Sequence, residues 1–162
     1  MKRFTDIKKV KRFNENDQSI EKVENTLTEV DITKEESSDV VKFFSKLFES
    51  REMAHIYHLQ VRGEESSYAK HEALGEYYEE VIEMIDDLIE VYQGQYGIVT
   101  GYDIIDTTNT NTKDPIDYFE ELGEFIKHSK KCILEEDTHI HGLIDDISCL
   151  MYKTLFKLKF NK

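Results

Sequence analysis

Three of the six histidines of the chain fall between residues 55 and 72, on either side of a polar loop. His58 lies near the end of one predicted helix and His71 near the start of the next. Neutral imidazole is a good ligand for iron or zinc. Asp86 and Glu90 are four residues apart, so they project from one side of a helix and together could hold a divalent cation. The alternative for both histidines is a hydrogen-bonded place in the core.

Two further patterns have the residue types of a metal site. Glu52 with His55, and Glu136 with His139, show the Glu-x-x-His spacing of di-iron helical bundles. The chain has 34 acidic residues, so chance also accounts for such pairs, and exposed surface is the alternative. Six carboxylates recur at three- and four-residue steps along one predicted helix: Glu72, Glu76, Glu79, Glu83, Asp86 and Glu90. This stripe is either a solvated face screened by salt or a surface that attracts cations.

Helices must position these residues. The chain has one proline and seven glycines, and its apolar residues recur at steps of three and four, which predicts an all-α domain. The spacing predicts a first helix over 38–61, capped by a serine, and a second over 66–93. Residues 1–37 are expected to form an N-terminal extension, made of a basic arm and a polar linker, before a domain over 38–162.

A long connection follows the second helix. Residues 94–113 lose helical spacing and gain Gly, Thr and Asn, which is typical of irregular structure. A segment of this length can travel along a bundle, so the second and third helices are expected to run parallel, joined by a crossover. Asp114 and Pro115 then predict a capped start for the third helix. Asp137 and Thr138 interrupt the chain and begin a fourth helix, which carries apolar positions to Leu158.

The histidine region matches a known pattern. His58 is followed five residues later by Gly63, His71 is followed directly by Glu72, and a carboxylate pair lies fifteen and nineteen residues beyond His71. This arrangement resembles the Dps-like mini-ferritins, small ferritin-like proteins that oxidise and store iron. Residues 135–138, before the fourth helix, are also similar to the corresponding part of that family. The resemblance covers roughly residues 38–158.

The resemblance implies a ferritin-like four-helix bundle. In that family, the two histidines come from one subunit and the carboxylate pair from its two-fold partner. The resemblance therefore implies that iron, or zinc in its place, is bound by His58 and His71 of one subunit and by Asp86 and Glu90 of the other. The implied activity is oxidation of Fe(II), and the implied assembly is a dimer at minimum or a larger shell.

The sequence departs from the family pattern at three places. The loop between the two histidines is one residue longer, Leu59 replaces an aromatic residue, and Gly75 stands where the family has a carboxylate one turn after the second histidine. These departures keep the enzymatic activity open. The alternative is a non-catalytic helical assembly or interaction protein whose metal site has degenerated and holds no metal.

The charge of the chain bears on its partners. A formal net charge of −13 repels nucleic acid and anionic membranes. The first thirteen residues nevertheless carry six cations: Lys2, Arg3, Lys8, Lys9, Lys11 and Arg12. Some Dps-like proteins hold DNA with lysine-bearing tails, so the resemblance implies DNA binding here that is weak and salt-sensitive, or none. Docking of this arm onto a protein surface is the alternative, because apolar residues recur in it every three positions.

No segment is apolar and long enough to span a bilayer, and the N-terminus lacks the hydrophobic stretch of a signal peptide. We therefore expect a cytoplasmic protein. Cys132 and Cys149 show no CxxC spacing, so buried thiols are expected rather than a disulfide or a metal site.

Overall fold

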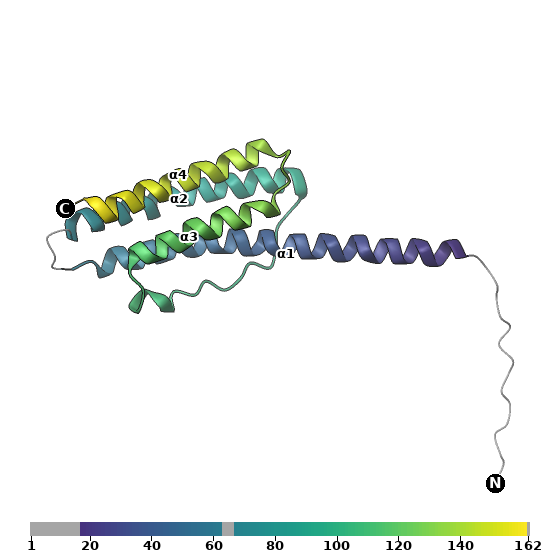
Figure 1. Ribbon diagram of the computed structural model, residues 1–162, viewed down its shortest axis with the longest axis horizontal. Helices are drawn as coiled ribbons and strands as arrows, with labels where there is room; N and C mark the ends of the chain where they lie inside the picture. Colours follow the sequence, from purple (N-terminus) through teal and green to yellow (C-terminus); the bar gives the residue numbers. More distant parts are fainter. Residues whose placement is uncertain (1–16, 63–66, 162) are drawn as a thin grey trace, which may run out of the picture. The chain divides into compact units, whose positions relative to one another are not determined.

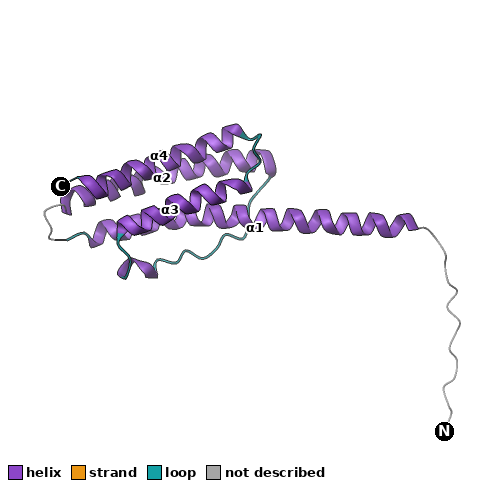
Figure 2. Ribbon diagram, viewed as in Figure 1, coloured by secondary structure: helices purple, strands orange, loops and turns teal. Residues whose placement is uncertain are grey.

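The computed structural model describes residues 17–62 and 67–161, with the side chains of residues 17–38, 67, 109 and 111 outside that description. Its helices are α1 (Asp17–Gln60), α2 (Ser67–Tyr96), α3 (Pro115–Ser129) and α4 (Thr138–Phe160), with two short 3-10 helices, η1 (Thr108–Asn111) and η2 (Lys130–Cys132) (Figure 1). Those described ranges contain no strand (Figure 2), which confirms the all-α class. The chain divides into two units, Met1–Lys34 and Glu35–Lys162, and the second unit holds the buried core.

Helix α1 begins at Asp17 rather than at Ser38, so residues 17–37 are helical where the sequence indicated a linker. These residues contain neither glycine nor proline, and their Glu and Lys residues have favourable helix propensities. The apolar spacing that predicted a start at residue 38 reflects burial in the bundle, which includes Val40 and Phe44. A helix can continue towards its N-terminus without such burial, and this is why the predicted helix start at residue 38 was wrong.

Helices α1 and α2 form an antiparallel hairpin. Ser50 Oγ and Tyr77 OH lie 2.9 Å apart in the buried core. The rings of Phe44 and Tyr92 are 5.3 Å apart, edge to face. Phe44 precedes Ser50 in α1, whereas its partner Tyr92 follows Tyr77 in α2. The two helices therefore run in opposite directions.

The buried face of α2 is rotated from the predicted one. The apolar spacing over 66–93 predicts a core face that includes Tyr78 and Ile82 together with Leu74, Ile85 and Ile89, but Tyr78 and Ile82 are only partly buried. The residues that are buried include Ala73, Leu74, Tyr77, Val81, Ile85, Leu88 and Ile89. Helix α2 packs against α4 as well as α1, so its buried arc is turned towards α4 and is wider than one apolar stripe.

The crossover from α2 to α3 runs along α1 (Figure 1). Helix α2 continues through Gly94 and ends at Tyr96, where Gly97 takes a φ of +95°, so the crossover starts three residues later than predicted. The backbone N–H of Asp103 donates to Ser45 Oγ over 2.9 Å, and the ring of Tyr102 packs on Phe48 of α1.

Helix α3 starts where the sequence predicted. The Asp114 carboxylate accepts a hydrogen bond from Ile116 N over 2.8 Å, and Pro115 occupies the first helical position. Tyr118 packs on Tyr57 and Phe125 packs on Phe43, so α3 runs opposite to α1 and parallel to α2. The expected parallel course of the second and third helices is therefore observed.

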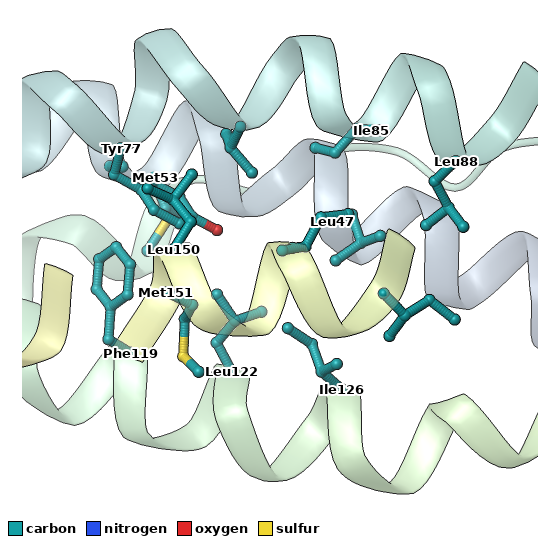
Figure 3. Close-up of a cluster of buried hydrophobic side chains, with 14 of the residues drawn as sticks. Leu47, Met53, Tyr77, Ile85, Leu88, Phe119, Leu122, Ile126, Leu150 and Met151 are labelled. Carbon is teal, nitrogen blue, oxygen red and sulfur yellow. The ribbon is translucent and has the colours of Figure 1, made fainter. Parts of the chain in front are cut away.

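Helix α4 closes the bundle against α2 and α3. Lys157 pairs with Glu76 of α2, and Lys159 pairs with Glu120 of α3. Side chains from all four helices meet in the core shown in Figure 3, which includes Leu47, Met53, Tyr77, Ile85, Leu88, Phe119, Leu122, Ile126, Leu150 and Met151.

The start of α4 is tied to the end of α2 through Asp137. This residue is 4% exposed, and its carboxylate accepts hydrogen bonds from Gln95 Nε2 over 2.8 Å and from Tyr96 OH. The bond from Tyr96, and after it the bond from Gln95, lowers the pKa of Asp137. The same bond to Asp137 is the first cause that raises the pKa of Tyr96 to about 12.

Asp137→Asn should lower the melting temperature at neutral pH, because the amide loses the charge that Tyr96 and Gln95 stabilise. A lowered carboxyl pKa contributes stability above the ordinary Asp value of about 4, and this is lost as the pH falls through the folded-state pKa. The raised pKa of Tyr96 contributes stability below its ordinary value, and this is lost as the pH rises through about 12. Thermal melts followed by circular dichroism should show the largest difference from wild type between about pH 5 and 9. The exposed Asp87→Asn is the matched control, and an equal effect from it would contradict the assignment.

Candidate metal centre at the α1–α2 hairpin

The two histidines singled out in the sequence meet at the loop end of the hairpin. His58, in the last turn of α1, places Nδ1 2.8 Å from the carbonyl oxygen of His71. His71, in the second turn of α2, places Nδ1 3.0 Å from the carbonyl oxygen of His58. The two rings stack, with centroids 3.6 Å apart and planes inclined by 25°. We call this reciprocal arrangement the histidine clasp.

The clasp fixes the protonation pattern of both rings. A carbonyl oxygen can only accept, so each Nδ1 carries the hydrogen and donates it. In the neutral imidazole, each Nε2 is then left with a lone pair. Histidines that bind metals commonly donate their other N–H to a backbone carbonyl in this way, since the bond fixes the tautomer and the ring orientation.

Aromatic side chains line one side of the clasp. The ring of Tyr78 stands edge-on to His58, 5.3 Å between centroids, and His55 packs against Tyr78 at 4.5 Å. The guanidinium of Arg51 lies over the ring of the same tyrosine, 5.8 Å from its centroid. Tyr78 therefore contacts both His55 and His58, a role that the sequence pattern did not reveal.

Gly75 lies directly beneath the clasp. A Cβ atom on this buried residue would sit 3.3 Å from both Cε1 and Nδ1 of His58. Contacts this short require the neighbouring ring to move. The absence of a side chain at residue 75 therefore lets the His58 ring approach the α2 backbone and reach the His71 carbonyl.

The structure does not bring Asp86 and Glu90 to the clasp within one chain. Both are exposed on α2, and Asp86 lies about 22 Å beyond His71 along the helix axis, from fifteen residues at the α-helical rise. In residues 17–62 and 67–161, no group of three or more His, Cys, Asp or Glu side chains is placed to hold a metal ion. One chain alone offers the clasp as two nitrogen ligands and a separate carboxylate pair.

The two Glu-x-x-His pairs do not form metal sites in the described chain. Glu52 pairs with Arg51, while His55 packs on Tyr78. At the other end of the bundle, His139 Nε2 lies 3.0 Å from Gln95 Oε1, so it belongs to the polar network around Asp137. The surface alternative is therefore favoured for Glu52, and a structural role for His139.

The remaining candidates are more dispersed. Glu76 of the acidic stripe pairs with Lys157, and the other five carboxylates of the stripe are exposed. The basic arm with Lys2, Arg3, Lys8, Lys9, Lys11 and Arg12 lies outside the described residues. Both cysteines are free thiols. Cys132 is partly buried, and burial raises its pKa to about 11, whereas Cys149 is exposed, so the prediction of a buried thiol was wrong for Cys149.

The helical arrangement and the clasp define a class: an all-α protein whose first hairpin is closed by paired histidines. A family model described as "Family of unknown function (DUF5856)" matches residues 58–158, from His58 to the last turn of α4. The chain belongs to this family. No curated protein and no solved structure matches it. Each helix in the described ranges is too short or too polar to cross a membrane.

His58→Ala and His71→Ala should each lower the free energy of unfolding by about 1 kcal/mol, because each removes one interhelical hydrogen bond. The carbonyl acceptors remain in either variant, so only the ring stacking couples the two positions. A double-mutant cycle by urea unfolding in EDTA should therefore give a coupling of about 0.5–1 kcal/mol.

His128→Ala is the matched control for this cycle, since His128 is exposed and its Nδ1 lies 2.6 Å from the Glu124 carbonyl of its own helix. Strict additivity of the two clasp substitutions would show that the stacking contributes nothing.

Proposed function

We propose that this protein is a ferritin-like, metal-binding assembly protein in which the histidine clasp supplies part of an intersubunit site for Fe(II) or a similar divalent metal. The observation that carries the proposal is the hydrogen bonding of the clasp. Both Nδ1 atoms are held by carbonyl oxygens, and both Nε2 atoms keep a lone pair for a metal.

The topology supports the ferritin-like part of the proposal. The parallel pair α2 and α3, the long crossover between them, and the opposite course of α1 and α4 to that pair follow the connectivity of ferritin-like bundles. A fold does not decide an activity, so the metal site must be argued from its ligands.

A second copy would supply the missing ligands. When two α2 helices pack antiparallel about a two-fold axis near residues 79 and 80, His71 of one subunit lies opposite residues 86–90 of the partner subunit, because the offsets from the axis are equal. His58 and His71 would then face Asp86 and Glu90 of the partner subunit. This gives a divalent metal nitrogen and oxygen ligands of the kind that iron and zinc accept.

The charge of α2 makes this interface dependent on the cation. Glu79, Glu80 and Glu83 are exposed near the proposed axis, so the partners would repel each other there. A bound divalent metal offsets part of that repulsion. The proposal therefore couples metal binding to association of the subunits.

Oxidation of Fe(II) is a separate property of the same site. Oxidation of two Fe(II) ions with reduction of O₂ to H₂O₂ consumes two protons, and the ligands named above would hold the iron as substrate. Anaerobic loading with Fe(II), followed by admission of O₂ and measurement of Fe(III) absorbance, distinguishes binding alone from oxidation.

The second candidate function is a non-catalytic assembly or interaction protein in which the clasp only closes the hairpin. Two observations favour it: the His71 ring satisfies the carbonyl of His58 in the last turn of α1, and Gly75 stands where a carboxylate would complete the Dps-like pattern. The two functions differ in whether the clasp takes up metal.

Calorimetric titration with Zn(II), and with Fe(II) without oxygen, should show binding to wild type and none to His58→Ala/His71→Ala or to Asp86→Ala/Glu90→Ala. Each variant leaves only half of the ligands of a shared site. An equimolar mixture of the two variants should recover about a quarter of the wild-type capacity, because half of the dimers are mixed and each of these has one complete site out of two.

Glu79→Ala/Glu83→Ala is the matched control for this titration. It removes two carboxylates of the same stripe at the same spacing, and it should keep the binding. If wild type takes up neither metal, the clasp is structural and the second candidate function is correct.

Gly75→Asp should weaken metal binding, although it introduces the carboxylate that the Dps-like pattern has at this position. The new Cβ would meet the His58 ring at 3.3 Å, so the ring must move away from the His71 carbonyl. Titration with Zn(II) should show at least about a threefold increase in Kd, with a lower melting temperature in EDTA. Ile104→Asp, at a crossover residue that is 94% exposed, is the control. Tighter binding by Gly75→Asp would contradict the assigned role of the glycine.

A further inference from the structure

Helix α4 exposes a stripe of aromatic side chains along its C-terminal half. Tyr152, Phe156 and Phe160 are 53%, 58% and 66% exposed, and they recur every four residues. The rings of Phe156 and Phe160 pack on each other with centroids 5.3 Å apart. A large contiguous apolar patch on a strongly charged protein commonly marks an interaction surface.

A groove lies beside this stripe. It has a volume of about 730 Å³, and it is lined on the α4 side by Cys149, Lys153 and Phe156 and on the α2 side by Glu76 and Glu80. The groove and the stripe form one surface with apolar and charged parts, which we call the α4 face.

The charges of α4 are divided between its halves. Asp145 and Asp146 are exposed in the N-terminal half, and Lys153 is exposed in the C-terminal half. Cys149, also exposed, lies midway: Asp145 is four residues before it and Lys153 is four residues after it. Two such helices placed antiparallel about Cys149 bring Asp145 of each opposite Lys153 of the other.

The same register provides space for an aromatic ring. Gly142 is seven residues before Cys149, and Phe156 is seven residues after it. Apart from its chain neighbours and the backbone of its own helix, nothing lies within 4 Å of the Cβ position of Gly142, which is exposed. The antiparallel pairing therefore places each exposed Phe156 over the open surface at Gly142 of the other helix.

We propose that the α4 face binds a second copy of this chain, in an antiparallel two-fold pairing of the α4 helices centred on Cys149. A two-fold interface must be complementary to itself, and the α4 face meets this condition in both charge and shape. Asp145 pairs with Lys130 within its own chain, and this side chain is 61% exposed, so it is accessible to a second cation. The pairing needs no metal, so it can be tested in EDTA apart from the site at the histidine clasp.

The first test uses the thiol at the proposed axis. In EDTA, after removal of metal, oxidation by diamide should join two Cys149 thiols, whose two protons and two electrons pass to the diazene and reduce it to the hydrazine. The product should be a disulfide-linked dimer on a non-reducing gel. Cys149→Ser should abolish this product, and Cys132→Ser should not. Rapid cross-linking requires the two Cα atoms to lie within about 7 Å, so absence of the product would overturn the register.

The second test uses the charges and sedimentation velocity under reducing conditions in EDTA. Lys153→Glu and Phe156→Asp should each raise the dimer Kd by about tenfold or more. The charge exchange Asp145→Lys/Lys153→Glu should restore the wild-type Kd, because residues 145 and 153 then again carry opposite charges across the interface. Ile104→Asp, at a crossover residue that is 94% exposed, is the matched control and should leave the Kd unchanged.

A wild-type chain that stays monomeric in EDTA at every micromolar concentration would overturn the proposal. Dimerisation in EDTA without metal uptake would support the α4 pairing and reject the metal site, so the two proposals can fail separately.

Discussion

The hydrogen bond between Ser50 and Tyr77 fixes the register on which the rest of the bundle depends. Tyr77 is fully buried, and burial raises the pKa of its phenol far above the ordinary value. A buried hydroxyl without a partner costs about 1–3 kcal/mol, so a slip of one helical turn between α1 and α2 is strongly disfavoured. In this register His58 reaches His71 and Phe44 reaches Tyr92, which closes both ends of the hairpin.

The sequence predicted those features that local physical chemistry determines. The helix start at Asp114 and Pro115 follows from capping, and the crossover follows from Gly, Thr and Asn. The start of α1 could not be predicted from apolar spacing, because a charged helix needs no buried stripe. The buried face of α2 was displaced because the contact with α4 depends on how the helices assemble.

Parts of the candidate site were likewise predictable from the sequence, and other parts were not. His58 and His71 were recognisable by residue type and spacing, and the structure places them in contact. Their bonds to each other's carbonyl oxygens were not predictable, since the hydrogen-bond acceptors belong to backbone of the opposite helix. The network of Asp137 with Gln95 and Tyr96 was also missed, because Asp137 lies more than forty residues after the other two and no sequence pattern links them.

The contact between Gly75 and His58 has a consequence for how this family can diversify. A side chain at residue 75 occupies the space of the imidazole, so the two positions cannot change independently without loosening the hairpin. Relatives with a larger residue at the equivalent of 75 should carry a smaller or differently oriented residue at the equivalent of 58. Such paired exchange would separate members that keep the clasp from members that close the hairpin by other contacts, and it would divide the family into two lineages.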